Sequence, residues 1–329
     1  CMTRQAAAAA VGAMGSAVMK SSGAVDNIKM CLSSKVVGVR AAAAHALATI
    51  GEPAASLAPA VAELLTDDGE DDSGLASQMG TSTRRAPPQI RRPKCAALTA
   101  LGRMGDETYI RAISNLLSDT NWEVRMTAIE ALAAFGEAAK GEASALASML
   151  DDETFPVRAT ACVALGEVKG MEALARLVEA FEDPAQTVRL HAVSAVGAMG
   201  EGAEEYCHDV FKLLNDEVSH VRAAAAVTLS RLGATGENYA GVVATLLYDE
   251  DADIRGAAVQ ALGGMGKAGA VCADEITERV YNDPSAAVRQ AAAEALAALG
   301  LGGQPALQDA GGFDGMGLHY ADIQSKKEE

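Results

Sequence analysis

One short motif returns nine times along this chain of 329 residues and limits what the chain can fold into. Each copy begins at a basic residue, continues through small apolar residues and ends at a glycine, as in "VRAAAAVTLSRLG" (221–233). The basic residues are Arg4, Arg40, Lys94, Arg125, Arg158, Arg189, Arg222, Arg255 and Arg289. The steps between them are 31 to 36 residues long, apart from one step of 54 after Arg40. A period of this length indicates an array in which each repeat stacks on its neighbours.

Each copy has the spacing of an amphipathic helix when its positions are counted from the basic residue. Position +3 is alanine in all nine copies, +7 is leucine or valine, and +10 is a larger apolar residue. Apolar residues at these intervals fall on one face of an α-helix. The glycine that follows, at +11 in eight copies, favours the left-handed backbone that ends a helix. A second helical segment precedes each copy, for example at 142–150 and 204–214. The repeat is therefore a pair of helices, and we call its second member the Arg-headed helix.

The turn between the two helices carries an aspartate six residues before the arginine in six repeats. With this spacing, the unit resembles the short HEAT-like repeats of the phycobilin-lyase type over residues 1–300. The signature residues of ankyrin and tetratricopeptide repeats, which have similar periods, are absent. The resemblance implies an all-α fold, a right-handed α-solenoid of about nine two-helix repeats, followed by a non-repeat tail at 301–329.

The regularly placed arginines have two interpretations. They line a groove for phosphates, or they form a structural ladder of charged hydrogen bonds with the turn aspartates, within and between repeats, as the resemblance implies. A phosphate site needs no aspartate at fixed spacing, so the pattern favours the ladder. Its expected members are Asp119, Arg125, Asp152, Arg158, Asp183, Arg189, Asp216, Arg222, Asp249, Arg255, Asp283 and Arg289. Losing one member of a buried pair leaves the other charge unpaired.

The composition restricts the core and the partners. Half of the residues are hydrophobic but only 4% are aromatic, and alanine supplies much of the hydrophobic content. Such a core requires helices that approach closely. The formal net charge of −17 argues against a nucleic-acid partner, because binding phosphates requires a concentrated basic surface.

The cysteines and the termini bear on the compartment. The six cysteines, at positions 1, 31, 95, 162, 207 and 272, have no CxxC spacing, and we expect reduced thiols in a soluble protein of a reducing compartment, the cytoplasm or an organelle interior. No continuous apolar run is long enough for direct membrane insertion. The chain begins at a cysteine, so N-terminal processing and a start inside a longer protein both stay open.

Two segments interrupt the pattern, and we expect both to be either solvated or docked on a partner as peptides. An insertion at 67–92 is acidic at first and basic later, and its arginines are the expected contacts. The tail at 301–329 is rich in glycine, with isolated aromatic residues as anchors. The expected contact residues of the two segments are Arg84, Arg85, Arg91, Arg92, Phe313 and Tyr320.

One position of the Arg-headed helices varies while its neighbours stay constant. This is position +5, whose variation fits either a recognition surface or an unconstrained solvent face. In HEAT-like solenoids this helix usually lines the concave side, so we predict partner contacts here. The predicted residues are His45, Thr99, Glu130, Val163, Ser194, Val227, Gln260 and Glu294.

The sequence offers no catalytic constellation and no cofactor site. Deoxyhypusine hydroxylase has similar repeats, but its di-iron site depends on His-Glu dipeptides, which this sequence lacks. Glu204 and His208 share a helix face beside Asp209, without further metal ligands in view. No nucleophile elbow or P-loop is present, so we expect the chain not to be an enzyme.

These observations favour a non-catalytic protein–protein interaction scaffold or clamp within a larger assembly, with other protein subunits as partners. The alternative from another class is a bilin lyase, or a chromophore or assembly chaperone, because the repeat resembles that family. A helical adaptor for a regulatory enzyme, as in HEAT phosphatase scaffolds, is a third option.

Overall fold

The computed structural model describes residues 14–70 and 91–302, so most of the first repeat copy, including Arg4, lies outside the described residues. Every regular element in these two ranges is an α-helix or a short 3₁₀ helix, which confirms the all-α prediction. The chain divides into two compact units, Cys1–Thr235 and Gly236–Glu329. Each unit is described by itself.

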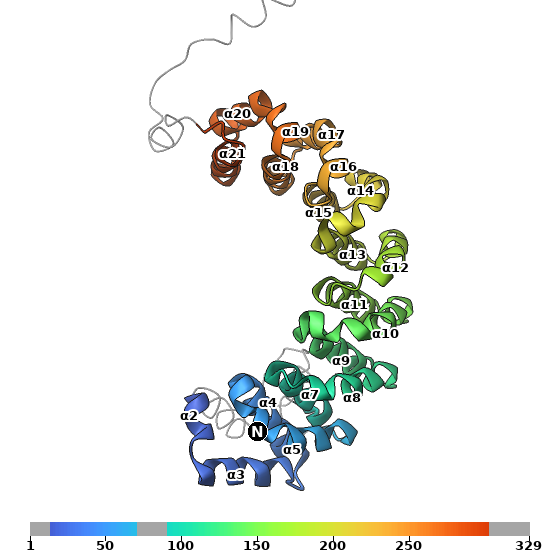
Figure 1. Cartoon of the computed structure of the whole chain (residues 1–329), viewed down its shortest axis with the longest axis vertical. Coiled ribbons are helices and arrows are strands. Elements are labelled where there is room, and N and C mark those ends of the chain that lie inside the picture. The colour runs from blue at the N-terminus through green and yellow to red at the C-terminus, as the bar shows by residue number, and fades with distance from the viewer. Residues whose placement is uncertain (1–13, 71–90, 303–329) are drawn as a thin grey trace, which may run out of the picture. The chain divides into compact units, whose positions relative to one another are not determined.

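Unit 1 contains six Arg-headed helices among its described residues, and they pack in sequence, each against the next. Figure 1 shows them as one layer of this unit. They are α4 (Val37–Ile50), α7 (Pro93–Met104), α9 (Trp122–Ala134), α11 (Phe155–Glu167), α13 (Gln186–Met199) and α15 (Ser219–Leu229).

The first helices of the repeats form the other layer of unit 1 (Figure 1), and short 3₁₀ turns extend most of them. They are α3 (Ser22–Leu32), α5 (Ala58–Ala62), α8 (Ile110–Ser114), α10 (Ala143–Ser148), α12 (Leu174–Glu179) and α14 (Cys207–Lys212). The adjoining 3₁₀ turns are η1 (Glu52–Leu57), η2 (Glu63–Thr66), η3 (Glu107–Tyr109), η4 (Asn115–Ser118), η5 (Gly136–Glu142), η6 (Met149–Asp151), η7 (Met171–Ala173), η8 (Ala180–Glu182), η9 (Gly200–Tyr206) and η10 (Leu213–Asn215).

Three short elements complete the array outside these pairs. Helix α2 (Ser16–Met19) precedes α3, α16 (Gly233–Glu237) contains the boundary between the units, and α19 (Gly266–Ala270) lies in unit 2. Unit 2 is built from α17 (Ala240–Thr245), η11 (Leu246–Tyr248), α18 (Ala252–Gly264), α20 (Ala273–Asn282) and α21 (Ala286–Ala298). Its two Arg-headed helices, α18 and α21, pack against each other.

Alanine and leucine build the core at the positions that the sequence predicts. The alanine at +3 is 0% exposed in seven of the eight described repeats, and only Ala43 is partly exposed. The residue at +7 is also buried in every described repeat. Because alanine adds little volume, neighbouring helices pack closely, and the core depends on fit rather than on large side chains.

Where an Arg-headed helix carries a glycine at +8, that glycine lies close to the +6 residue of the next Arg-headed helix. A Cβ placed on Gly102 would lie 3.0 Å from Ala131 Cα, and one on Gly263 would lie 2.9 Å from Ala295 Cβ. Thr228 is the one +6 residue that is not alanine, and it lies against Gly197. Its hydroxyl donates to the Val193 carbonyl at 3.0 Å. The exception is therefore accommodated by a hydrogen bond between helices.

The helix ends follow the glycine pattern. Gly105 has φ 71° and ψ 16°, the left-handed conformation that the sequence predicts at +11. Gly51 also has a positive φ, 70°, but with an extended ψ of −139°. In the repeat of Arg158 the glycine is shifted by one residue, and Lys169 takes the left-handed conformation instead, with φ 54°. It is the only described residue other than glycine with a positive φ. The shift in the motif therefore leaves the turn geometry in place.

Candidate interaction surface

Each ladder arginine that pairs with a turn aspartate joins two repeats. The Arg125 guanidinium donates through Nε to Asp152 Oδ2 at 2.6 Å and through Nη2 to Asp152 Oδ1 at 2.9 Å, which is a bidentate pair with the next repeat. Its Nη1 donates to the backbone carbonyl of Asp119 at 2.9 Å, in its own turn. The aspartate six residues upstream is thus held through its backbone, whereas the aspartate of the following repeat supplies the carboxylate.

The same geometry recurs along both units. The bidentate pairs within a unit are Arg40–Asp67, Arg125–Asp152, Arg158–Asp183, Arg189–Asp216 and Arg255–Asp283. The Nη1 atoms of Arg222 and Arg289 also donate to the carbonyls of Asp216 and Asp283. Lys94 replaces an arginine and pairs with both Asp68 and Asp119.

Asp67 is a ladder residue that the sequence analysis missed. The insertion separates it from Lys94, so the six-residue spacing does not reveal it. The number of residues along the sequence from an arginine to the aspartate of the next repeat is a better signal of a ladder pair. It is 27 residues for Arg40 and Asp67, 27 for Arg125 and Asp152, and 28 for Arg255 and Asp283.

Five of the ladder carboxylates are held in their ionised form. Burial of Asp283 opposes ionisation, but hydrogen bonds from Arg255 and from the Ser285 N–H outweigh this effect and hold the pKa of Asp283 below its usual value. The pKa values of Asp67, Asp152, Asp183 and Asp216 are lowered in the same way. The arginines are therefore occupied by the protein's own anions.

We call the +5 positions of the Arg-headed helices the +5 strip. In every described repeat the +5 side chain is exposed or partly exposed, whereas the residues at +6 and +7 are buried. Val163 is the clearest example, because it keeps 40% of its surface exposed although it is a large hydrophobic residue. The strip therefore offers side chains of varied chemistry from fixed positions.

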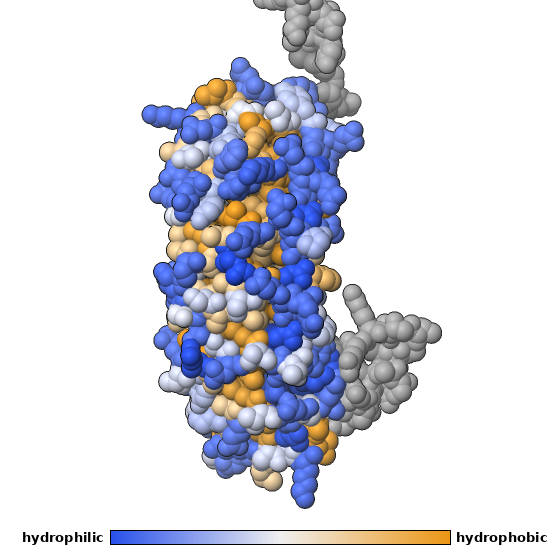
Figure 2. All heavy atoms as spheres, turned by 90° about the vertical axis from the view of Figure 1, so that its right-hand side faces the viewer, coloured by the Kyte–Doolittle hydropathy of each residue, from blue (hydrophilic) through white to orange (hydrophobic). Residues whose placement is uncertain are grey.

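The opposite layer has a different surface. Figure 2 shows the face formed by the first helices of the repeats, where hydrophilic side chains dominate and hydrophobic ones show between them. Several of these polar groups form exposed ion pairs, such as Arg176 with Asp151 and Lys212 with Asp209. Such pairs keep this surface polar.

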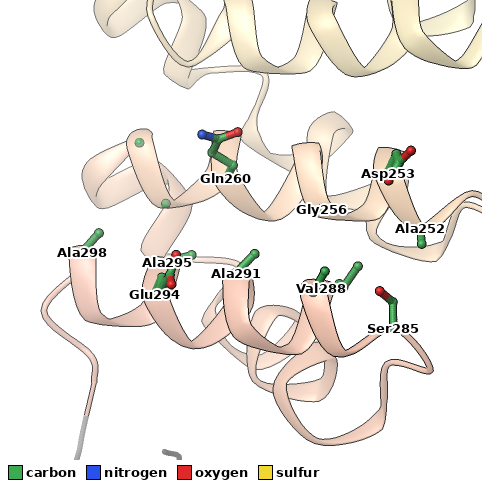
Figure 3. Close-up of a pocket in the computed structure, with 13 residues that line it drawn as sticks. Ala252, Asp253, Gly256, Gln260, Ser285, Val288, Ala291, Glu294, Ala295 and Ala298 are labelled. Carbon is green, nitrogen blue, oxygen red and sulfur yellow. The ribbon is translucent and has the colours of Figure 1, made fainter.

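In unit 2 a groove lies between α18 and α21, and residues of the +5 strip line both of its sides. The groove has a volume of about 600 Å³, and both predicted residues of this unit, Gln260 and Glu294, line it. Figure 3 shows the two helices running in the same direction, with the polar side chains of Asp253, Gln260 and Glu294 among glycines and alanines. The structure thus places these two predicted residues at one site.

The predicted contacts of the insertion have another environment. Arg91 is only 3% exposed and pairs with Glu70 and Glu123, and Arg92 pairs with the same two carboxylates. These contacts occupy both guanidinium groups within the chain, so we do not propose Arg91 and Arg92 as partner contacts. The other four predicted residues of the insertion and tail, Arg84, Arg85, Phe313 and Tyr320, lie outside the described residues.

Two exposed aromatic residues were not singled out from the sequence. Trp122 is 40% exposed and Phe155 is 52% exposed, and both stand three residues before the arginine of their repeats. A large apolar residue at the first position of an Arg-headed helix is the signal that identifies them. They lie on neighbouring repeats, at the edge where the turns are.

The residues considered for metal binding have separate contacts. Glu204 accepts hydrogen bonds from Thr235, Asp209 pairs with Lys212, and the His208 ring stacks on Phe211. Within residues 14–70 and 91–302, no group of three or more His, Cys, Asp or Glu side chains is placed to hold a metal ion. Among the same residues, no helix combines the length and apolarity that crossing a membrane requires.

Fold and surface together define an all-α solenoid of two-helix repeats. A family model described as HEAT repeats matches residues 87–156, 143–230 and 239–310, which together make up more than half of the chain. The chain therefore belongs to the HEAT repeat family. No curated protein matches its sequence.

Solved structures of similar fold include two karyopherins. Kap121p superimposes with a TM-score of 0.60 and 16% sequence identity, over 84% of this chain and 33% of that chain. Importin beta gives a TM-score of 0.56 at 16% identity, over 83% of this chain and 42% of that chain. An engineered protein gives 0.53 at 20% identity, over 91% of this chain and 85% of that chain. The chain spans about a third of Kap121p, and at these identities the likeness concerns the fold alone.

Proposed function

We propose that the chain is a non-catalytic scaffold or clamp that binds other protein subunits through its +5 strip. The observation that carries this proposal is that position +5 is exposed or partly exposed in every described repeat, while positions +6 and +7 are buried. The residue type at +5 also differs between most repeats. A scaffold needs variable contact residues on rigid supports, and the packed Arg-headed helices supply the support.

Two further observations support the proposal. The ladder arginines are paired with aspartates of the chain itself, so they are unsuited to binding phosphates. Structures of the similar karyopherin Kap121p include complexes with Pho4p and with the extreme C-terminus of Cdc14p, so that protein binds both a protein and a peptide segment. The shared fold makes a protein partner the first expectation for this chain.

The test compares two valines of nearly equal exposure. Val163 belongs to the +5 strip and is 40% exposed, whereas Val242 belongs to α17 in the layer of first helices and is 39% exposed. We expect Val163→Arg to reduce recovery of the partner from the source cells strongly, and Val242→Arg to leave it unchanged, with equal circular dichroism for both variants. Equal recovery with both variants contradicts the proposal.

Photo-crosslinking identifies the surface directly. A photoreactive residue replaces Ser194, which is in the +5 strip, or Ser148, which is exposed on α10. We expect crosslinked partner only from position 194. A monomer without any stable partner in native mass spectrometry refutes the scaffold. Bilin binding by the purified protein supports the lyase alternative instead.

A further inference from the structure

The last ladder arginine, Arg289 on α21, has an open hydrogen-bonding edge. Its Nη1 donates to the backbone carbonyls of Asp283 at 2.7 Å and Pro284 at 3.3 Å, in its own turn. In Arg255, which has the same position on α18, Nε and Nη2 bind the Asp283 carboxylate. In the part of the chain that the structure describes, no carboxylate binds the Nε and Nη2 atoms of Arg289. The guanidinium is therefore oriented by its own turn and is complementary to one further carboxylate.

The surface of α21 beside this arginine is less covered than that of α18. On α18 the +4 residue Val259 and the +10 residue Met265 are 0% exposed. The corresponding residues of α21, Ala293 and Leu299, are partly exposed, and Leu301 just after the helix is 49% exposed. Among the described residues α21 is the last helix of unit 2 (Figure 1). The end of the array thus lacks the cover that a further repeat gives.

The chain leaves α21 along the side where a further repeat would pack. Gly300 reverses the backbone after the helix, with φ 75°. A Cβ on Gly302 would lie 3.0 Å from Ala297 Cα, so the backbone at 302 lies against the helix. Ala297 is at +8, the position at which Gly263 of α18 contacts Ala295 of the next Arg-headed helix. The start of the tail therefore lies on the surface that the array leaves open.

The tail at 303–329 lies outside the described residues, but its sequence contains a carboxylate at the spacing of the ladder. The bidentate pairs join residues that are 25 to 28 positions apart along the chain. Asp314 is 25 positions after Arg289, whereas the other two aspartates of the tail, Asp309 and Asp322, are 20 and 33 positions after it. Asp314 is thus the tail aspartate that has the ladder spacing.

The tail is also long enough to reach the arginine. The twelve residues from Gly302 to Asp314 span up to about 40 Å when extended, at about 3.3 Å each. Ala297 and Arg289 are eight residues apart on α21, which is about 12 Å along the helix axis. The HEAT repeat match at 239–310 continues past α21 into the tail. The repeat pattern therefore extends beyond the last described helix.

We propose that the tail segment 303–314 folds back on α21, and that the Asp314 carboxylate binds Nε and Nη2 of Arg289. This contact adds one more pair to the ladder and caps the end of the array, where repeat proteins require a polar cover. A second copy of the chain is a less suitable source of the carboxylate, because its first described turn has Ser34 in place of the aspartate six residues before Arg40. The cap is independent of the partners of the +5 strip.

The test uses zero-length cross-linking by a carbodiimide, which joins a lysine amine to a carboxylate that it contacts. The variant is Arg289→Lys in the full chain, because Lys94 at the equivalent position binds Asp119, also 25 positions away, at 3.0 Å. We expect mass spectrometry to find residue 289 joined to Asp314, and the joined peptide to disappear when Asp314→Asn is added. Absence of this link, or a link mainly to another aspartate of the tail, overturns the inference.

Isotope mixing distinguishes the same chain from a second copy. Unlabelled and heavy-nitrogen forms of Arg289→Lys are mixed before cross-linking. A cap within one chain gives links only within light or within heavy peptides. Links that combine light and heavy peptides assign the open edge to a second copy and overturn the inference.

Hydrogen exchange tests the cap without a change to the arginine. Asp314→Asn removes the proposed partner, whereas Asp309→Asn makes the same change of charge five residues earlier in the tail. We expect the α21 amides to exchange about two- to fivefold faster in Asp314→Asn and at an unchanged rate in Asp309→Asn, since a partly exposed pair contributes modestly. Equal rates in the two variants overturn the inference. Protection of α21 that depends on the partner captured through Val163, rather than on Asp314, assigns the open edge to that partner and overturns it as well.

Discussion

Removing the carboxylate of Asp283 tests whether the ladder stabilises the array. Its side chain is 0% exposed, and it pairs with Arg255, whose side chain is 8% exposed, through hydrogen bonds of 2.7 Å and 2.9 Å. The comparison is Asp151, which is 73% exposed and receives two bonds of 2.8 Å from Arg176. The hydrogen bonds of the two pairs have similar lengths, but the pairs differ in burial.

The expected losses of unfolding free energy differ several-fold. Asp283→Ala leaves the Arg255 guanidinium buried without its carboxylate, and breaking a buried pair in this way costs about 3–5 kcal/mol. The same change removes the acceptor for the Ser285 N–H at the start of α21. Asp151→Ala breaks an exposed pair, which contributes about 0–1 kcal/mol. Arg176 also keeps Glu179 at 2.8 Å.

Hydrogen exchange measured by mass spectrometry is the suitable assay, because repeat arrays unfold in parts and a single melting temperature averages over them. We expect Asp283→Ala to reduce the protection of α18, α20 and α21 strongly, and Asp151→Ala to leave protection nearly unchanged. The double variant Arg255→Met with Asp283→Leu should recover most of the loss, since apolar replacement of a buried pair is often neutral. A loss below about 1 kcal/mol for Asp283→Ala, or similar losses for both single variants, refutes the reasoning.

Three further predictions follow from the same structure. The pKa is lowered in five ladder aspartates: Asp67, Asp152, Asp183, Asp216 and Asp283. Their ionised forms stabilise the fold above the unfolded pKa of about 3.9, so the urea concentration at the unfolding midpoint should fall as the pH drops below about 4. Asp283→Asn should reduce this acid-induced loss of stability in unit 2. An acid loss in unit 2 that is unchanged in that variant counts against the Asp283 pair as its source. Gly256→Ala should stabilise α18 by about 0.5–1 kcal/mol, whereas Gly263→Ala should destabilise it through contact with Ala295, and equal signs in thermal melts contradict the packing described. Burial raises the pKa of Cys95 to about 11 and of Cys162 to about 12, so peptide-resolved alkylation at pH 8 should label exposed Cys31 before Cys95 and Cys162. Rapid labelling of Cys162 in the folded protein argues against its burial.

The fold could be predicted because the same helical pattern occurs in nine copies. Positions +3, +7 and +10 fall on one helix face in each copy. A single segment of this length could be assigned to a helix only weakly, whereas nine matching segments indicate a helix clearly. The six-residue spacing from aspartate to arginine could also be read directly. It reflects the bond from the arginine to the backbone carbonyl of its own turn, as between Arg158 and Asp152 at 2.8 Å. The partner carboxylate belongs to the next repeat, which this local spacing does not show.

Neither the groove between α18 and α21 nor the ion pairs of Arg91 and Arg92, at the end of the insertion, could be predicted from the sequence. Gly256 is one small residue among many, and only the distance between α18 and α21 turns its missing side chain into an opening. Arg91 and Arg92 belong to a charged segment that looks exposed in the sequence. The structure pairs them with Glu70 and Glu123, which come from two places far apart along the chain. Such contacts depend on tertiary structure rather than on local pattern.

The arginine ladder gives the array a chemical direction. Each linking arginine faces forward to the carboxylate of the following repeat, and each linking aspartate faces backward to the preceding arginine, as Arg125 and Asp152 do. A cut between two whole repeats therefore leaves a guanidinium on one fragment and a carboxylate on the other. The broken ends are complementary and unlike each other, so the two halves can rejoin in only one order. The same asymmetry allows a complete repeat to be gained or lost from the middle of the array without leaving a charge unmatched.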